Sequence, residues 1–163
     1  MMSVARWYLI AVVIFVIDQV TKTIAVTQLN YADPVAVMPG FNFTLLYNTG
    51  AAFSFLAEAG GWQRWFFVIL TSIISVGLVI WIKRIATEQK LLSLALALVL
   101  GGALGNLYDR VLLGYVVDFV QWYYESWYWP AFNIADAAIC VGGVLLLVDA
   151  YRDHRKAKET NNV

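Results

Sequence analysis

The stretch NIADAAICVGGVLLLVDAY, residues 133–151, begins with an asparagine and soon meets an aspartate, then continues as a long apolar run. A helix needs roughly 20 residues to cross a bilayer, with a range of about 17–25, and this stretch is long enough. Asn133 is followed three residues later by Asp136, which is the form of a capping box, so a helix is predicted to begin here. This span therefore starts with a carboxylate at its edge.

Three other apolar runs have a similar length. With the first stretch, they predict membrane spans near residues 7–26, 65–82, 91–107 and 134–151. Composition agrees, because 61% of the 163 residues are hydrophobic and only 13% are charged, unlike a soluble globular protein. We expect an integral membrane protein, mainly α-helical, with one domain over residues 1–163. The first run is longer than the apolar part of a usual signal peptide, so we expect it to be retained.

Basic residues indicate how the spans are oriented. Eight of the 11 Lys and Arg residues lie at the termini or between the second and third spans: Arg6, Lys83, Arg84, Lys90, Arg152, Arg155, Lys156 and Lys158. Cytoplasmic loops carry such an excess, so both termini are predicted to be cytoplasmic. Residues 27–64 and 108–133 are then outside, which in a bacterium is the periplasmic side of the inner membrane. The zero net charge indicates no general attraction to nucleic acid.

Each outer region has a recognisable pattern. In the first, Pro39-Gly40 is a turn signal, and Phe41–Leu45 alternates apolar and polar residues as a half-buried strand does. We expect a small sheet within about residues 30–56, supported by the helices or by lipid. In the second, the tryptophans and tyrosines of residues 121–129 are typical of a segment in the membrane interface. This aromatic segment is expected to anchor the protein there, to cover the site, or both.

Asp118 and Asp136 are the candidate catalytic residues. A carboxylate at the edge of hydrocarbon is costly, so it usually has a function or a partner. Asp118 interrupts an apolar stretch, and desolvation raises the pKa of a carboxyl group. If the two acids approach closely, they share one proton, as in an aspartic protease. The structural alternatives are that Asp136 only caps a helix and that Asp118 only pairs with Arg110.

Other catalytic schemes have few candidate residues. His154, the only histidine, lies in the tail on the opposite side of the membrane from the outer regions, which disfavours catalytic triads and zinc sites built on histidine. A dyad of Ser54 and Lys22 has no supporting motif. A calcium or magnesium site that adds Asp109 to the two aspartates has no recognisable ligand spacing.

Three further groups of residues have structural and functional interpretations. Asp18 and Lys22 are four residues apart, so an ion pair on one helix face is expected. Arg110 either grips substrate carbonyls or pairs with Asp109. The segment Asn48–Phe53 is either a plain hairpin turn or one wall of a peptide-binding cleft.

The glycines of residues 101–105 have a Gly-xxx-Gly spacing, and close helix packing explains it.

The main alternative function is a small proton-coupled transporter or assembly factor that uses the same acids as a relay. Transporters commonly show repeats or broken central helices, and we find neither pattern in the sequence.

Five segments together resemble lipoprotein signal peptidase (signal peptidase II), a family of bacterial aspartyl peptidases of the inner membrane. In order, they are Asp18-Gln19-Val20-Thr21-Lys22, Asn48–Phe53, Gly101–Arg110, Val117-Asp118-Phe119 and Phe132–Asp136. The resemblance implies removal of signal peptides from prolipoproteins just before a diacylglyceryl-modified cysteine, without metal or cofactor. It also implies four transmembrane helices, a small periplasmic β-cradle and an extracytoplasmic helix or loop, here residues 121–129.

The resemblance also implies roles for individual residues. The catalytic pair would be Asp118 and Asp136. The residues expected to line the substrate site are Asn48, Gly50, Asn106, Arg110 and Asn133. The residues expected to support the site are Asp18, Lys22 and Asp109. The expected partners are a lipid-modified prolipoprotein and membrane lipid, and the enzyme is expected to be a monomer.

Overall fold

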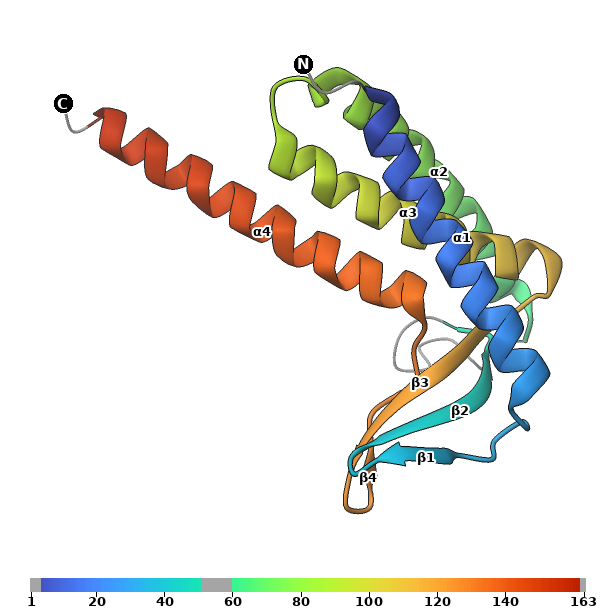
Figure 1. Cartoon of the computed structure of the whole chain (residues 1–163). Coiled ribbons are helices and arrows are strands. Elements are labelled where there is room, and N and C mark those ends of the chain that lie inside the picture. Colours follow the sequence, from blue (N-terminus) through green and yellow to red (C-terminus); the bar gives the residue numbers. More distant parts are fainter. Residues whose placement is uncertain (1–3, 51–59, 162–163) are drawn as a thin grey trace.

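The computed structural model describes residues 4–50 and 60–161 of the chain. Figure 1 shows a bundle of long helices with a small sheet below one end. The helices are α1 (Val4–Gln28), α2 (Trp62–Ile85), α3 (Lys90–Leu112) and α4 (Ile134–Asn161). The strands are β1 (Val35–Met38), β2 (Phe41–Asn48), β3 (Val116–Tyr124) and β4 (Trp127–Tyr128).

All four helices are long and apolar enough to cross a membrane. Each is longer than the span predicted for it, and the largest differences are that α3 continues to Leu112 and α4 to Asn161. A helix rises about 1.5 Å per residue, so the 28 residues of α4 extend about 42 Å, more than the ~30 Å of a hydrocarbon core. α4 is therefore longer than the hydrocarbon core of a bilayer is thick.

The central helix of the bundle is α3, which packs against α1, α2 and α4. Glycines on α3 allow its neighbours to approach closely. A Cβ added at Gly101 would lie 2.7 Å from the backbone oxygen of Ala11 on α1, and one added at Gly102 would collide with the backbone oxygen of Ala135 on α4. The two glycines thus face different helices, and the predicted close packing of this segment is confirmed.

Large apolar side chains cover the outer surface of the other helices. On α1 and α2 they include Leu9, Ile24, Ile69 and Ile73, all exposed. Exposed apolar surface of this extent marks an interface with a partner or a membrane. On helices of membrane-spanning length, it is the surface that contacts lipid.

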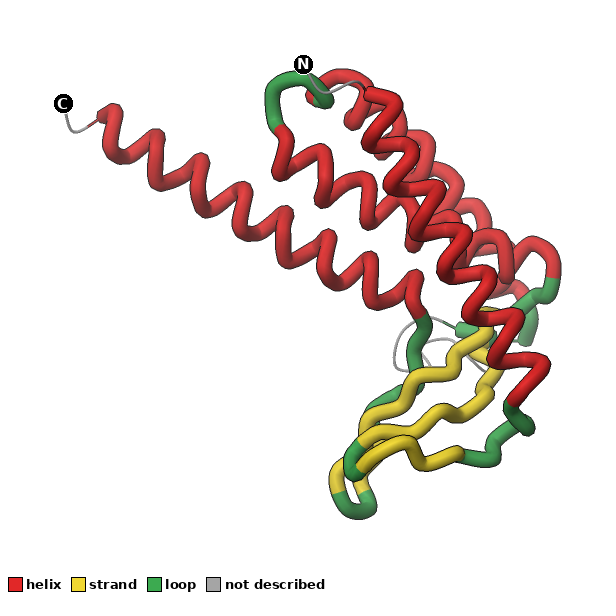
Figure 2. The backbone as a smooth tube through the Cα atoms, viewed as in Figure 1, coloured by secondary structure: helices red, strands yellow, loops and turns green. Residues whose placement is uncertain are grey.

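The strands form one antiparallel sheet in the order β1-β2-β3-β4 (Figure 2). The turn predicted at Pro39-Gly40 is present between β1 and β2, and Gly40 has a φ of 85° there. The sheet is larger than the prediction, because β3 from the second outer region pairs with β2 over Phe41–Asn48. Part of the range predicted for the sheet, residues 51–56, lies outside the described residues.

The aromatic segment 121–129 differs from the expected loop or helix. It contains the end of β3 and all of β4, which pair as Tyr123 with Tyr128 and Tyr124 with Trp127. Aromatic residues favour strands, because their side chains pack against cross-strand neighbours. Tyr123 and Tyr128 do so here, with ring centroids 5.7 Å apart.

Candidate active site

Backbone pairing at the end of the sheet brings the two candidate acids together. Asp118 lies in β3, and Asp136 lies in the first turn of α4. The backbone nitrogen of Val120 donates to the oxygen of Phe132 at 2.9 Å, and the nitrogen of Phe132 donates back at 3.0 Å. This pairing places Asn133, the residue before α4, next to Asp118.

Asn133 holds both acids. Its Nδ2 donates to Oδ1 of Asp118 at 2.6 Å, while its Oδ1 accepts from the backbone nitrogen of Asp136 at 2.9 Å. The backbone nitrogen of Asn133 donates to Oδ2 of Asp136 at 3.3 Å. The predicted capping box is therefore confirmed. The same side chain that begins α4 also binds the acid in β3, and it is fully buried.

Each carboxyl group receives a second amide donor. Asn106 Nδ2 donates to Oδ1 of Asp136 at 2.7 Å, and Asn48 Nδ2 donates to Oδ2 of Asp118 at 3.2 Å. Asn48 is itself held by a turn, since its Oδ1 accepts from the backbone nitrogen of Gly50 at 2.9 Å. Asp118 thus binds two asparagines, and the alternative that it only pairs with Arg110 is wrong.

A buried lysine supports the acids from α1. Lys22 Nζ lies 2.8 Å from Oδ2 of Asp18, 2.8 Å from Oδ2 of Asp109 and 3.0 Å from Oδ1 of Asn106. These three contacts match the three donors of an ammonium group. The predicted Asp18–Lys22 pair is confirmed, and Asp109 joins it. Because Oδ1 of Asn106 faces Lys22, its Nδ2 is directed to Asp136.

Gln19 is a supporting residue that sequence reasoning did not single out. Its Nε2 lies 3.1 Å from Oδ2 of Asp18 and donates to Oδ1 of Asp109 at 3.0 Å. Asp18 in turn accepts from the backbone nitrogen of Ala135 at 2.9 Å, which ties α1 to the first turn of α4. The available signal was a polar side chain at membrane depth, directly after an acid.

Arg110 lies against the turn that carries Asn48. Its Nη2 donates to the backbone oxygen of Gly50 at 2.7 Å, and its guanidinium lies 5.0 Å from the centre of the Phe67 ring. Asp109 instead pairs with Lys22, so the expectation that Arg110 only pairs with Asp109 is wrong. The remaining residues of the Asn48–Phe53 segment, 51–53, lie outside the described part of the chain.

Arg64 is a second supporting residue that the sequence did not reveal. Its Nε donates to the backbone oxygen of Arg110 at 2.8 Å, and its Nη2 donates to that of Val111 at 2.7 Å. A cation that binds the last carbonyls of a helix also interacts favourably with the helix dipole. Arg64 therefore stabilises the end of α3 from which Arg110 projects.

Asp118 has the electrostatic environment of an acid that titrates near neutrality. Burial raises its pKa to about 7, and the negative charge of Asp136 acts in the same direction. Hydrogen bonds from Asn48 and Asn133 oppose the rise, because they favour the ionised form. A carboxyl group with such a pKa can hold a proton at physiological pH and release it during a reaction.

The alternative catalytic sites find little support among the described residues. Over residues 4–50 and 60–161, no three His, Cys, Asp or Glu side chains are grouped as a metal would require. Asp109 faces Lys22 in an ion pair. Lys22 has three polar partners already, and Ser54, its proposed partner in a dyad, lies outside the described residues.

Comparison with known proteins shows the family to which the chain belongs. A family model described as signal peptidase (SPase) II matches residues 10–152. A lipoprotein signal peptidase of Ectopseudomonas mendocina is 54% identical over 155 residues, 94% of this chain and 92% of the relative. One from Pseudomonas aeruginosa is 50% identical over 154 residues, 93% of this chain and 91% of the relative.

The fold also resembles solved structures. A structure described as a bacterial membrane enzyme superimposes with a TM-score of 0.83 at 36% identity, covering 92% of this chain and 90% of the other. A second, described in the same words, gives a TM-score of 0.79 at 37% identity, covering 91% and 94%. These relatives support a bacterial multi-pass membrane protein, and none of them supports the transporter alternative.

Proposed function

The chain belongs to the signal peptidase II family and cleaves signal peptides from lipoproteins, and we propose that it does so as an aspartic endopeptidase with Asp118 and Asp136 as the catalytic pair. The observation that carries this proposal is the position of Asn133. One buried side chain donates to Asp118 at 2.6 Å and accepts from the backbone of Asp136 at 2.9 Å. The two acids are thereby held at one site at the end of the bundle.

The helix dipole favours different protonation states for the two acids. Both acids accept hydrogen bonds on both carboxyl oxygens, but only Asp136 lies in the first turn of α4, at the positive end of the helix dipole. Asp136 is therefore the ionised member. Asp118 is the protonated member, in keeping with its pKa of about 7.

The reaction follows from this assignment. Asp136 removes a proton from a water molecule, and the resulting hydroxide attacks the scissile carbonyl carbon while Asp118 gives its proton to the carbonyl oxygen. In the second step the C–N bond breaks, and the proton held by Asp136 goes to the leaving nitrogen. The hydroxyl proton of the intermediate returns to Asp118, so both acids are restored. No metal or cofactor takes part in this scheme.

The substrate is a prolipoprotein, cut just before its diacylglyceryl-modified cysteine. Its lipid chains lie in the bilayer, so it reaches the acids sideways from the membrane. Asn48, Gly50 and Arg110 form one side of the proposed binding site, joined by the 2.7 Å bond from Arg110 to Gly50. Asn106 and Asn133 form the other side, next to the acids that they bind.

The orientation follows from the basic residues at the end of the bundle opposite the sheet. We place the protein in the inner membrane with both termini in the cytoplasm and the acids on the periplasmic side. The exposed rings of Trp122, Tyr124 and Trp127 would then lie in the outer interface, where they anchor the sheet.

The test is cleavage of a purified lipidated prolipoprotein by the wild-type chain and by Asp118→Asn and Asp136→Asn. Each variant should lose cleavage completely while keeping its helical circular dichroism in detergent, because each removes one member of the proton-sharing pair. The same substrate without its diacylglyceryl group should be cut poorly. Cleavage by either variant would rule out the catalytic pair.

A further inference from the structure

The C-terminal part of α4, farthest from the proposed catalytic acids, diverges from the other helices. Gly142 still packs closely against α3, with an added Cβ only 2.6 Å from Cγ2 of Val99, and Leu146 still contacts the hydrophobic core. Beyond that point the side chains are mostly exposed, and the red end of α4 diverges from the other helices in Figure 1. Residues 147–159 of this helix are thus mostly exposed, with Asp149 half-buried.

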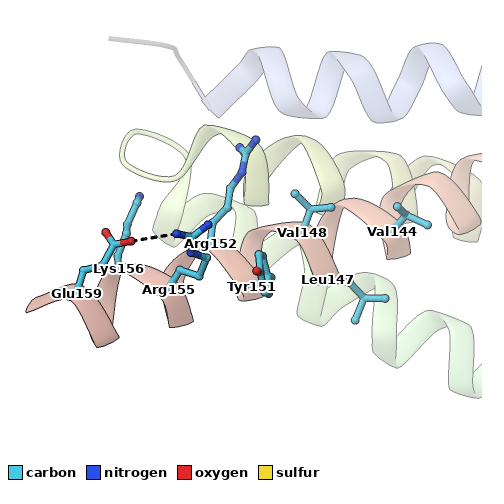
Figure 3. A pocket seen from close by; sticks show the side chains of 8 residues that line it. All are labelled: Val144, Leu147, Val148, Tyr151, Arg152, Arg155, Lys156 and Glu159. Carbon is cyan, nitrogen blue, oxygen red and sulfur yellow. Dashed lines mark hydrogen bonds and ion pairs between the residues drawn. The ribbon is translucent and has the colours of Figure 1, made fainter. Parts of the chain in front are cut away.

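This segment carries an open groove of about 770 Å³ on one helix face (Figure 3). Its lining residues are Val144, Leu147, Val148, Tyr151, Arg152, Arg155, Lys156 and Glu159. They recur every three or four positions, which places them on one side of a helix. We refer to this feature as the α4 groove.

The chemistry of the α4 groove changes along its length. Its first three lining residues are aliphatic, Tyr151 follows, and the last four are charged. Of those four, three are basic and one is acidic, a formal excess of two positive charges. The ion pair between Arg155 and Glu159 spans 3.3 Å between exposed side chains, and such a pair contributes little. The nearby acid Asp153 faces the side of α4 opposite the groove, so it does not offset the charge of the lining residues.

The order of aliphatic, aromatic and basic residues along the α4 groove matches the order of acyl chain, interface and phosphate in a phospholipid. An acyl chain fits the aliphatic part, the tyrosine ring lies at the level of the interface, and the cations lie where a lipid phosphate would be. With the proposed orientation, they face the cytoplasmic leaflet, whose anionic lipids attract basic segments next to a membrane helix. We propose that the α4 groove binds one anionic phospholipid of this leaflet, with its phosphate against Arg152, Arg155 and Lys156.

The site is separate from the catalytic acids. Asp136 and Arg152 are 16 positions apart along α4, which is about 24 Å of helix. A lipid bound there lies along one exposed face of α4, the helix whose other end carries Asp136. Its occupancy does not depend on peptidase chemistry, so binding can be measured even if the proposed catalytic pair is wrong.

The experiment measures binding of phosphatidylglycerol, an anionic lipid, to the full chain by native mass spectrometry in detergent, with phosphatidylcholine as the zwitterionic comparison. The groove variant carries Arg152→Gln, Arg155→Gln and Lys156→Gln. The matched control carries Lys83→Gln, Arg84→Gln and Lys90→Gln, which removes the same charge from exposed residues at the same end of the bundle.

The groove variant should bind phosphatidylglycerol about a hundredfold more weakly, because each cation near an anionic lipid contributes roughly fivefold. The control should bind as the wild type does. A charge-neutral variant, Leu147→Asn, should also weaken binding, because it disrupts the apolar part. Equal losses in the groove variant and the control would indicate diffuse attraction and overturn the proposal. Equal affinity for phosphatidylcholine, or full competition by inorganic phosphate, would also overturn it.

Discussion

The amide of Asn133 donates a 2.6 Å hydrogen bond to Asp118, a residue in a different element and 15 positions earlier in the chain. The bond links the sheet to the first turn of α4. It also fixes the amide, because the oxygen of the same group accepts from the backbone of Asp136 at 2.9 Å. Asn133 therefore combines a helix cap with a contact to the proposed catalytic acid.

These two roles can be separated by substitution. Asn133→Ala should lose about 1 kcal/mol of stability or more, because the cap of α4 is removed, and cleavage should fall by at least tenfold. Asn133→Ser restores a good cap but does not provide an amide donor for Asp118. We expect thermal unfolding of the serine variant to approach that of the wild type while cleavage stays low. Recovery of both properties together would show that capping alone matters.

Cleavage should depend on pH through Asp118. The proposed mechanism requires Asp118 protonated, and burial raises its pKa to about 7, so the rate should fall as the pH rises through 7. At low pH the rate should fall again as the second proton binds to the pair, which gives a bell-shaped profile. The profile is to be measured with saturating lipidated substrate. A rate that stays constant from pH 6 to 9 would contradict the assignment.

The same pKa also predicts the direction of a stability change. The folded chain holds the Asp118 proton more tightly than the unfolded chain does, since the pKa rises from 3.8 to about 7 on folding. Stability from this group is therefore complete below pH 4 and is lost as the pH rises through 7, by at most about 4 kcal/mol. Asp118→Asn cannot ionise, so its unfolding free energy should decline less over this range. Parallel curves for variant and wild type would argue against a raised pKa.

Lys22→Met should be strongly destabilising. It leaves Asp18 and Asp109, both buried, without their ammonium partner, and breaking a buried ion pair costs about 3–5 kcal/mol. It also removes the donor that orients the amide of Asn106. Chemical unfolding in detergent measures the loss. Thr23→Val is the matched control, because this exposed side chain on the same helix bonds to the preceding turn, at the oxygen of Gln19.

Gly102→Ala should separate α3 from α4. A Cβ at this position collides with the backbone oxygen of Ala135, one residue before Asp136, and overpacking typically costs about 1–3 kcal/mol. Gly143→Ala is the control, since a Cβ there has no atom within 4 Å, and alanine favours a helix by up to about 1 kcal/mol. We expect lower stability and cleavage for Gly102→Ala and no loss for the control. Normal cleavage by Gly102→Ala would show that the contact is not needed.

Local sequence patterns determined much of this protein. The four apolar runs predict the helices because membrane-spanning length and hydropathy are properties of contiguous residues. The Asn133–Asp136 capping box and the Asp18–Lys22 ion pair were predictable for the same reason, since each joins residues within one helical turn. The glycines of residues 101–105 likewise indicated close packing.

Only the tertiary structure decided which distant groups meet. Pairing of β3 with β2, and of Phe132 with Val120, brings Asn48, Asp118 and Asn133 together, and a strand pattern does not specify its partner. Hydrophobic patterning within each helix could not show that Lys22 contacts Asn106, or that Arg64 holds the end of α3. Those contacts depend on how three or more segments pack, because a buried polar group is stable only where the fold supplies its partners.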